Sequence, residues 1–276
     1  MAGNWEWVAE GVGVTTSRRE LTTSTVIVSG ASALLVDPSW DLDELDWIAT
    51  SLTAEGLTIT AGFSTHAHHD HLLWHSGFGD GPRWASPTTA QAAADRRAEF
   101  VAALGPLPDE PDEPDEPDEP DEPDEPDEPD EPDEPDEPVG RVRAVDGDRV
   151  PWPGPEVRLI VHNAHTPGHT ALWIPGTRVL LAGDMLSDVE LPLPEQTGLA
   201  DYAAGLDALR TCAENAAVVV PGHGHPGTGQ EPVRRWQADH DYVHTLLAGG
   251  DPEDPRRALP GMDQVHRANL TLAGRR

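Results

Sequence analysis

The chain has 276 residues, enough for one large domain or two small ones with a sizeable core. Its formal net charge is −32, but an Asp-Glu-Pro repeat at residues 108–138 supplies 20 of the 50 acidic residues, and the remainder carries an ordinary charge of about −12. This charge and the lack of a basic track argue against a general nucleic-acid binder, which has to neutralise phosphates.

Two residue types are nearly or wholly missing, and each limits the chemistry. There is no lysine, so Schiff-base and lysine-base mechanisms are excluded. Cys212 is the only cysteine, which rules out an internal disulfide, and its place in an expected helix favours a buried structural thiol over a nucleophile. Because the first residues lack a secretion signal and no run approaches the ~20 apolar residues of a membrane span, we expect a cytoplasmic protein without a membrane partner.

The chain opens with short β-prone segments separated by Gly and Ser, which is typical of an antiparallel meander. Hydrophobic periodicity then predicts helices and strands in alternation. The expected strands are 8–14, 25–29, 33–37, 57–63, 83–85, 141–145, 156–162, 171–174, 178–182 and 217–220; the expected helices are 41–55, 86–104, 202–213, 231–247 and, with a weaker pattern, 255–270. Strands, a helix, a strand and a helix follow one another in this order twice along the chain. This pattern is typical of two sheets packed face to face with helices outside, an α+β fold that forms a four-layer αβ/βα sandwich.

The repeat at 108–138 interrupts this order between a helix and a strand. It has no apolar side chain to bury, and Pro at every third position forbids helix and sheet ladders, so we expect a disordered, polyproline-like insertion in a single domain spanning 1–276. We interpret it as the neutral expansion of a surface loop; the alternative is an acidic spacer that collects cations or meets a basic partner. None of its residues is suited to catalysis.

Potential metal ligands are concentrated in the segment Thr65-His66-Ala67-His68-His69-Asp70-His71, directly after the expected strand 57–63. An extended backbone would point His66 and His68 the same way, because side chains repeat with period two along a strand. Asp70 and His71 then require a turn that places a second set of ligands opposite the first. Nitrogen ligands with one carboxylate and no thiolate favour zinc, with iron or manganese as alternatives.

Three further potential ligands appear downstream, each just after an apolar strand. They are His169 in Thr166-Pro167-Gly168-His169-Thr170, Asp184 in Gly183-Asp184, and His223 in Gly222-His223. With these residues in this order the sequence resembles the metallo-β-lactamase-fold hydrolases, whose pattern is His-x-His-x-Asp-His, Pro-Gly-His-Thr, Gly-Asp and a late Gly-His. The resemblance spans residues 66 to 223 and implies the same sandwich fold, with metals at one edge between the sheets.

The resemblance also implies a role for each ligand. The first metal would be held by His66, His68 and His169, the second by Asp70, His71 and His223, and Asp184 would bridge the two. On this resemblance His169 rather than His165 holds the family position. A hydroxide bound between two zinc ions is a nucleophile at neutral pH without any Ser, Cys or Lys, and Asp70 would orient it and relay a proton.

Three residues beside the ligands are candidates for the substrate pocket. Trp74 and His75 would narrow the cleft, with a core position for Trp74 as the alternative, and His225 would line the pocket. The expected substrate is a small ester, lactone or thioester, because the basic surface of nuclease-type relatives is missing.

Two other functions stay open. The same scaffold could bind one iron through His66, His169 and Asp184 and oxidise a persulfide with O₂. Alternatively, the protein could be a non-catalytic acidic interaction protein that displays residues 108–138, although the full ligand set argues against this.

Overall fold

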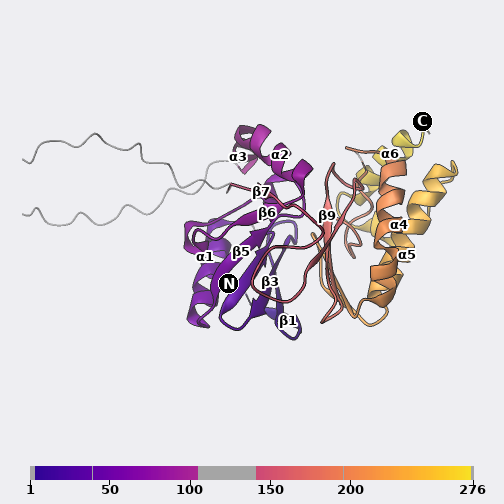
Figure 1. Cartoon of the computed structure of the whole chain (residues 1–276). Coiled ribbons are helices and arrows are strands. Elements are labelled where there is room, and N and C mark those ends of the chain that lie inside the picture. Colours follow the sequence, from indigo (N-terminus) through magenta and orange to yellow (C-terminus); the bar gives the residue numbers. More distant parts are fainter. Residues whose placement is uncertain (1–3, 39, 105–140, 195, 275–276) are drawn as a thin grey trace, which may run out of the picture.

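The computed structural model describes residues 4–38, 40–104, 141–194 and 196–274. The Asp-Glu-Pro repeat, and with it the expected disordered insertion, lies outside these residues. Two β-sheets lie face to face in the middle of the molecule, and helices cover the outer face of each sheet (Figure 1). This is the four-layer αβ/βα sandwich that the order of the elements predicts.

In the described part of the chain the first sheet has seven strands, arranged in sequence order. They are β1 (Glu6–Ala9), β2 (Val12–Thr16), β3 (Thr23–Ser29), β4 (Ser32–Val36), β5 (Thr58–Phe63), β6 (Arg83–Ala85) and β7 (Arg143–Ala144). β1 to β4 form the expected antiparallel meander. β5, β6 and β7 then add in parallel to β4.

The second sheet, again counted over the described residues, has five strands in the order β12-β11-β10-β9-β8. They are β8 (Arg158–Val161), β9 (Thr170–Ile174), β10 (Val179–Gly183), β11 (Val218–Pro221) and β12 (Gly227–Thr228). β10 and β11 are parallel, and the other neighbouring strands are antiparallel.

Helices α1 (Leu42–Ala54), α2 (Pro87–Asp95) and α3 (Arg97–Leu104) lie on the first sheet, and α4 (Leu199–Asn215), α5 (Glu231–Leu247) and α6 (Met262–Leu272) on the second (Figure 1). Short 3₁₀ helices span His69–His71, Ser76–Phe78 and Pro255–Ala258. Across the described ranges no helix combines the length and the apolar character that a membrane span needs.

The central core lies between the two sheets, and period-two alternation in the strands builds it. Leu34 and Val36 of β4 point inward to the second sheet, whereas Ala33 and Leu35 point outward to α1. Both faces of each sheet are covered, which explains why strands such as β4 (SALLV) and β10 (VLLAG) are apolar almost without interruption. Cys212 is half-buried in α4 and packs against the core under the second sheet.

Some element boundaries differ from the sequence-based expectation. The segment expected as one strand at 8–14 is a hairpin, because Gly11 adopts a φ of +66° and turns the chain between β1 and β2. The helix expected at 86–104 is divided at Arg96, although Ser86 caps its start as predicted by accepting a hydrogen bond from the Thr89 N–H (3.2 Å). The helix expected at 255–270 is divided before α6, where Gly261 has a φ of +80°.

The carboxyl ends of the parallel strands meet where the two sheets join. Asp37 follows β4 and the histidine-rich segment follows the parallel β5, while Asp184 follows β10 and His223 follows the parallel β11. Backbone hydrogen bonds connect the sheets at this edge, from Thr170 N–H to the Thr65 carbonyl (2.9 Å) and from Thr23 N–H to the Gly222 carbonyl (2.7 Å). Residues far apart in the sequence are thereby brought to one place.

Candidate metal centre

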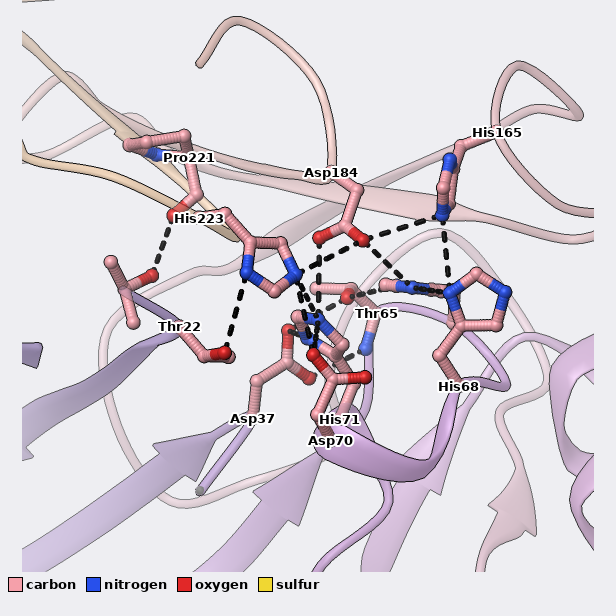
Figure 2. Close-up of polar contacts among 12 residues, drawn as sticks. Thr22, Asp37, Thr65, His68, Asp70, His71, His165, Asp184, Pro221 and His223 are labelled. Atoms are coloured by element: carbon pink, nitrogen blue, oxygen red, sulfur yellow. Dashed lines mark hydrogen bonds and ion pairs between the residues drawn. The ribbon is translucent and has the colours of Figure 1, made fainter. Parts of the chain in front are cut away.

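Two groups of side chains at this edge could each hold a metal ion. The first comprises His66, His68, His165 and Asp184, and the second Asp70, His71 and His223. Within each group the potential ligand atoms all lie within 4.8 Å of one another. Figure 2 shows the imidazoles and carboxylates of both groups pointing toward a common centre.

The segment after β5 supplies members of both groups because it changes conformation midway. His68 has an extended backbone (φ −109°, ψ 153°), and a 3₁₀ turn over His69–His71 follows. The turn carries Asp70 and His71 to the second group, as the sequence requires. His69 lies between them and packs its ring edge-on against Trp40, with ring centroids 5.0 Å apart.

The spacing of the inner atoms fits a tetrahedral metal. Nitrogen or oxygen ligands about 2.0–2.1 Å from zinc at tetrahedral angles lie about 3.3 Å from one another. In the first group His66 Nε2 is 3.0 Å from His68 Nδ1 and 3.2 Å from Asp184 Oδ2, and His165 Nε2 is 3.3 Å from the same oxygen. In the second, Asp70 Oδ2 is 3.2 Å from the Nε2 atoms of both His71 and His223.

Asp184 lies between the two groups. Its Oδ2 faces His66 and His165, while its Oδ1 is 3.3 Å from His71 Nε2 and has no hydrogen-bond partner. Asp184 is only 7% exposed, so water does not solvate this carboxylate freely. A buried carboxylate with an unsatisfied oxygen that faces imidazoles on two sides is a site for cations rather than a packing residue.

The outward nitrogens of the first-group histidines have polar partners. His165 Nδ1 lies 3.0 Å from the Leu193 carbonyl, and His66 Nδ1 lies 3.0 Å from Thr65 Oγ1. His68 turns its Nε2 to the side-chain amide of Gln196 at 2.7 Å. For His165 and His66, the hydrogen bond that the outer Nδ1 donates fixes the tautomer, so the inner Nε2 keeps a free lone pair.

The second group is oriented in the same way by residues of the first sheet. His71 Nδ1 lies 3.0 Å from Asp37 Oδ2, and the Thr65 backbone N–H donates to the other oxygen of Asp37 (2.9 Å). His223 Nδ1 lies 3.0 Å from the Glu20 carbonyl. Thr22 Oγ1 lies 3.3 Å from His223 Nδ1 (Figure 2) and also accepts a hydrogen bond from the Trp40 indole (2.7 Å).

The buried carboxylates set the charge of the cluster. Burial lowers the pKa of His71, but Asp70 and Asp184 outweigh it and raise this pKa well above its usual value. The pKa of His223 is likewise raised against burial, chiefly by Asp184. Both shifts favour a protonated imidazole, whose positive charge balances the carboxylates. Divalent cations would take over that balancing role, as metals displace protons from their ligands.

The remaining shifts follow from burial and from neighbours. Burial acts to raise the pKa of Asp184, but His71, His66 and His223 together outweigh it, and the pKa lies well below its usual value. Burial lowers the pKa of His66 well below 6.5 and that of His68 to about 4, so both imidazoles are neutral and ready to bind a cation. Burial raises the pKa of Glu190 to about 7; His223 opposes the rise and Asp184 adds to it.

His165, and not the expected His169, belongs to the first group. His169 is completely buried, and its Nε2 accepts a hydrogen bond from the Asp184 backbone N–H (3.1 Å), so that nitrogen faces the chain. The reason lies in the loop between β8 and β9. His162 N–H donates to the His169 carbonyl (2.8 Å), which makes His169 the residue that closes the loop, whereas His165 lies within it.

The three residues expected in the substrate pocket lie outside the two groups of potential metal ligands. Trp74 packs on Phe78, with ring centroids 5.2 Å apart, and belongs to the core between the first sheet and α1, as its alternative reading holds. His75 Nδ1 accepts the Gly77 N–H (3.1 Å) and caps a 3₁₀ helix. The turn at 69–71 sends the chain back over the outer face of the sheet. His225 is exposed and lies 3.0 Å from Asp188.

Sequence reasoning missed several polar partners of the histidines. Asp37 was assigned only to the end of a strand, yet it carries the signal that marks Asp184, an acidic residue directly after a buried strand. Gln196 and Glu20 carry no such signal. They lie 128 and 203 residues from the histidines that they contact, and only the folded chain relates them.

Comparisons with known proteins agree with this geometry. The family model described as Metallo-beta-lactamase superfamily matches residues 18–225. The DIM-1 metallo-beta-lactamase exposed to ceftazidime has a similar structure, with a TM-score of 0.62 and 16% identity over 89% of this chain and 98% of that chain. The metallo-beta-lactamase from Pontibacter korlensis has a TM-score of 0.58 and 18% identity over 86% and 98%.

A third similar structure, the Erythrobacter litoralis enzyme with beta mercaptoethanol in its active site, has a TM-score of 0.58 and 16% identity over 88% of this chain and 96% of that chain. Identities this low show a shared fold. No curated protein sequence matches the chain significantly. Since the family match covers most of the chain and includes the whole series of site residues, the chain belongs to the metallo-beta-lactamase superfamily.

Proposed function

We propose that this protein is a hydrolase that uses two metal ions, with zinc preferred over iron or manganese, to cleave a small ester, lactone or thioester. Membership of the superfamily and the two ligand groups support a metal-dependent hydrolase. The observation that carries the two-metal proposal is the position of Asp184, whose carboxylate faces the imidazoles of both groups.

The proposed ligands follow from this position. His66, His68 and His165 would hold one ion, Asp70, His71 and His223 the other, and Asp184 would contact both. Ions bound in this way supply Lewis-acid activation of the substrate and lower the pKa of water to ~7. The donor set is five imidazoles with two carboxylates and no thiolate, which suits zinc.

Asp70 has a second proposed role. Asp70 is 4% exposed, and burial acts to raise its pKa, but His71 and His223 together outweigh burial and hold the pKa well below its usual value. Asp70 is therefore an anion, which can accept a hydrogen bond from the attacking water and orient it. No residue outside the cluster is needed as nucleophile, which agrees with the absence of lysine and the half-buried Cys212.

The arginines of the C-terminal part favour an uncharged substrate over an anionic one. Arg234 and Arg235 both pair with Glu231, Arg256 pairs with Asp254, and Arg257 lies 3.5 Å from Asp251. Each of these guanidinium groups is paired with a neighbouring carboxylate rather than left to bind an anionic substrate, which supports a neutral acyl group at the reacting centre. The similar structures carry β-lactamase names, so a lactam belongs among the compounds to be tested.

The alternative of a single iron that oxidises a persulfide is supported less well. It would leave Asp70, His71 and His223 as a second buried group with no role. Metal analysis separates the two: about two zinc ions per chain support hydrolysis, and one iron supports the dioxygenase.

The proposal is tested by measuring bound metal by mass spectrometry and then assaying lactones, thioesters, lactams and phosphodiesters. His68→Ala and Asp70→Ala should each lower turnover at least about a hundredfold while the circular dichroism spectrum stays that of the wild type. His240→Ala on the surface of α5 is the control and should retain full turnover. Wild-type rates in metal-loaded His68→Ala or Asp70→Ala would contradict the proposal.

A further inference from the structure

The segment that follows β10 carries two parts of the proposed metal centre. Asp184 begins it, and its Leu193 carbonyl lies 3.0 Å from His165 Nδ1. The described residues 184–194 form turns and bends, without a helix or strand. Contacts from other elements must therefore fix this segment, because no backbone ladder does so.

Arg256 makes the most such contacts. This guanidinium is 7% exposed, in the 3₁₀ helix Pro255–Ala258, and its Nη1 donates to the carbonyls of Ser187 (3.0 Å) and Glu190 (2.7 Å). Its Nη2 and Nε donate to the two carboxylate oxygens of Asp254, at 2.8 and 3.1 Å. Arg256 thus joins the C-terminal part of the chain to the middle of segment 184–194.

Asp239 of α5 contacts both Arg256 and segment 184–194. It is 1% exposed, its Oδ1 is 2.7 Å from Arg256 Nη1, and its Oδ2 accepts the Leu186 N–H (3.1 Å). The buried ion pair therefore holds the segment by hydrogen bonds at three residues. Asp239 bonds to Leu186, and Arg256 bonds to Ser187 and Glu190. Leu186 is two residues from Asp184.

Two further hydrogen bonds connect segment 184–194 to the surroundings of the proposed ligands His223 and His165. Ser187 Oγ donates to the His223 carbonyl (2.7 Å), so the segment also touches the last ligand loop. Asn269 of α6 donates to the Pro192 carbonyl (2.8 Å), next to the Leu193 carbonyl that faces His165. The C-terminal part of the chain is thereby connected to Asp184, His165 and His223.

We propose that Arg256, paired with Asp239, is a positioning residue of the metal centre, which holds segment 184–194 so that Asp184 and His165 face the metals. This inference rests on the proposed function, since it assumes that the two groups bind metal. A planar guanidinium with several fixed donors can reach two carbonyls and two carboxylates at once, and a lysine ammonium cannot.

The test compares Arg256→Lys, the double variant Asp239→Asn/Arg256→Gln, and the control Arg257→Gln. The double variant removes the Asp239 carboxylate together with the guanidinium, so Asp239 is not left as an unpaired buried charge. Arg257 lies in the same 3₁₀ helix, but it donates to the Pro252 carbonyl of its own segment (3.2 Å). Zinc dissociation constants would be measured by chelator competition, alongside the absorption spectrum of the cobalt-substituted protein and circular dichroism.

We expect both Arg256 variants to bind zinc about tenfold or more weakly than the wild type, with an altered cobalt spectrum and an unchanged circular dichroism spectrum. Arg257→Gln should match the wild type. Zinc affinities within twofold of the wild type in both Arg256 variants would overturn the proposal. Loss of the fold in both would overturn it too, by showing that the ion pair serves the fold as a whole. A wild-type protein without metal affinity would instead refute the proposed function itself.

Discussion

At the scale of single residues, the direction of an imidazole nitrogen distinguishes a proposed metal ligand from a histidine that only packs beside the site. His165 and His169 are four residues apart in one loop and both nearly or fully buried, at 2% and 0% exposure. The Nε2 of His165 faces His68 and Asp184, whereas that of His169 accepts a backbone N–H. The sequence around them does not distinguish them, because each of the two histidines lies just before a Thr, in the segment that leads into β9.

Substitution of these two histidines tests the assignment. His165→Ala should lower the zinc content by about one ion per chain, since an inner nitrogen is removed. His169→Gln should keep both ions, because a glutamine oxygen can still accept the Asp184 N–H. Atomic absorption on dialysed protein measures the difference. The reverse pattern, with zinc lost only in His169→Gln, would restore the assignment made from sequence.

His162 predicts a dependence of stability on pH. Burial, with a smaller contribution from His165, lowers its pKa to about 4. In the unfolded chain its pKa is about 6.5, so below that pH the unfolded state binds a proton that the folded state does not. The contribution of neutral His162 to stability is therefore complete above pH 6.5 and is lost as the pH falls toward 4.

We expect the free energy of unfolding of metal-free protein to fall by ~2 kcal/mol between pH 7.5 and pH 5 on account of His162 alone. His162→Gln should lack this part of the decline, because glutamine does not titrate and can still accept the Ala164 N–H. Urea denaturation at both pH values measures it, with the exposed His244→Gln as control. An equal decline in wild type and His162→Gln would refute the assignment.

At the scale of elements, the end of β10 shows how a strand delivers a ligand. Gly183 has a φ of +56°, and its carbonyl accepts hydrogen bonds from Met185 N–H (2.7 Å) and Gly222 N–H (2.6 Å). The chain turns there, so Asp184 leaves the sheet toward the histidines. A Cβ at this position would collide with Nε2 and Cε1 of the buried His169.

Gly183→Ala should accordingly lower the free energy of unfolding by at least about 2 kcal/mol, through the strained backbone and the collision. Gly176→Ala, in the turn between β9 and β10, is the matched control, because a Cβ there meets nothing within 4 Å and should change stability by less than about 0.5 kcal/mol. Denaturant titration gives both values. Equal stabilities of the two variants would show that the turn at Gly183 tolerates a side chain.

At the scale of the whole molecule, both sheets supply the residues of the two candidate metal groups found in the described part of the chain. The first sheet delivers His66 to His71, and the second delivers His165, Asp184 and His223. The single-domain organisation, the disorder of 108–138 and the cytoplasmic location stay predictions. The repeat is joined to the described chain after α3 and before β7, on the side of the first sheet.

Replacing residues 108–138 with a short Gly-Ser linker should leave zinc content and turnover unchanged, because each proposed ligand lies outside the repeat. The variant should also elute from an anion exchanger at lower salt, since it loses 20 acidic residues. Parallel metal analysis and hydrolysis assays of both forms measure the effect. A variant with intact metal content and lost turnover would assign a catalytic role to the repeat.

The hydrophobic period of the sequence and its resemblance to a known family predicted the layered fold, the edge at which potential metal ligands gather and most residues of the two candidate groups. The sequence placed His66 to His71 as one turned segment and Asp184 and His223 after their strands. Only the tertiary structure brought His165 rather than His169 into the first group, placed Trp74 and His75 at the outer face, and brought Asp37 and Gln196 into contact with His71 and His68. The direction of a side chain depends on which distant backbone it meets, and that is set when the two sheets pack together.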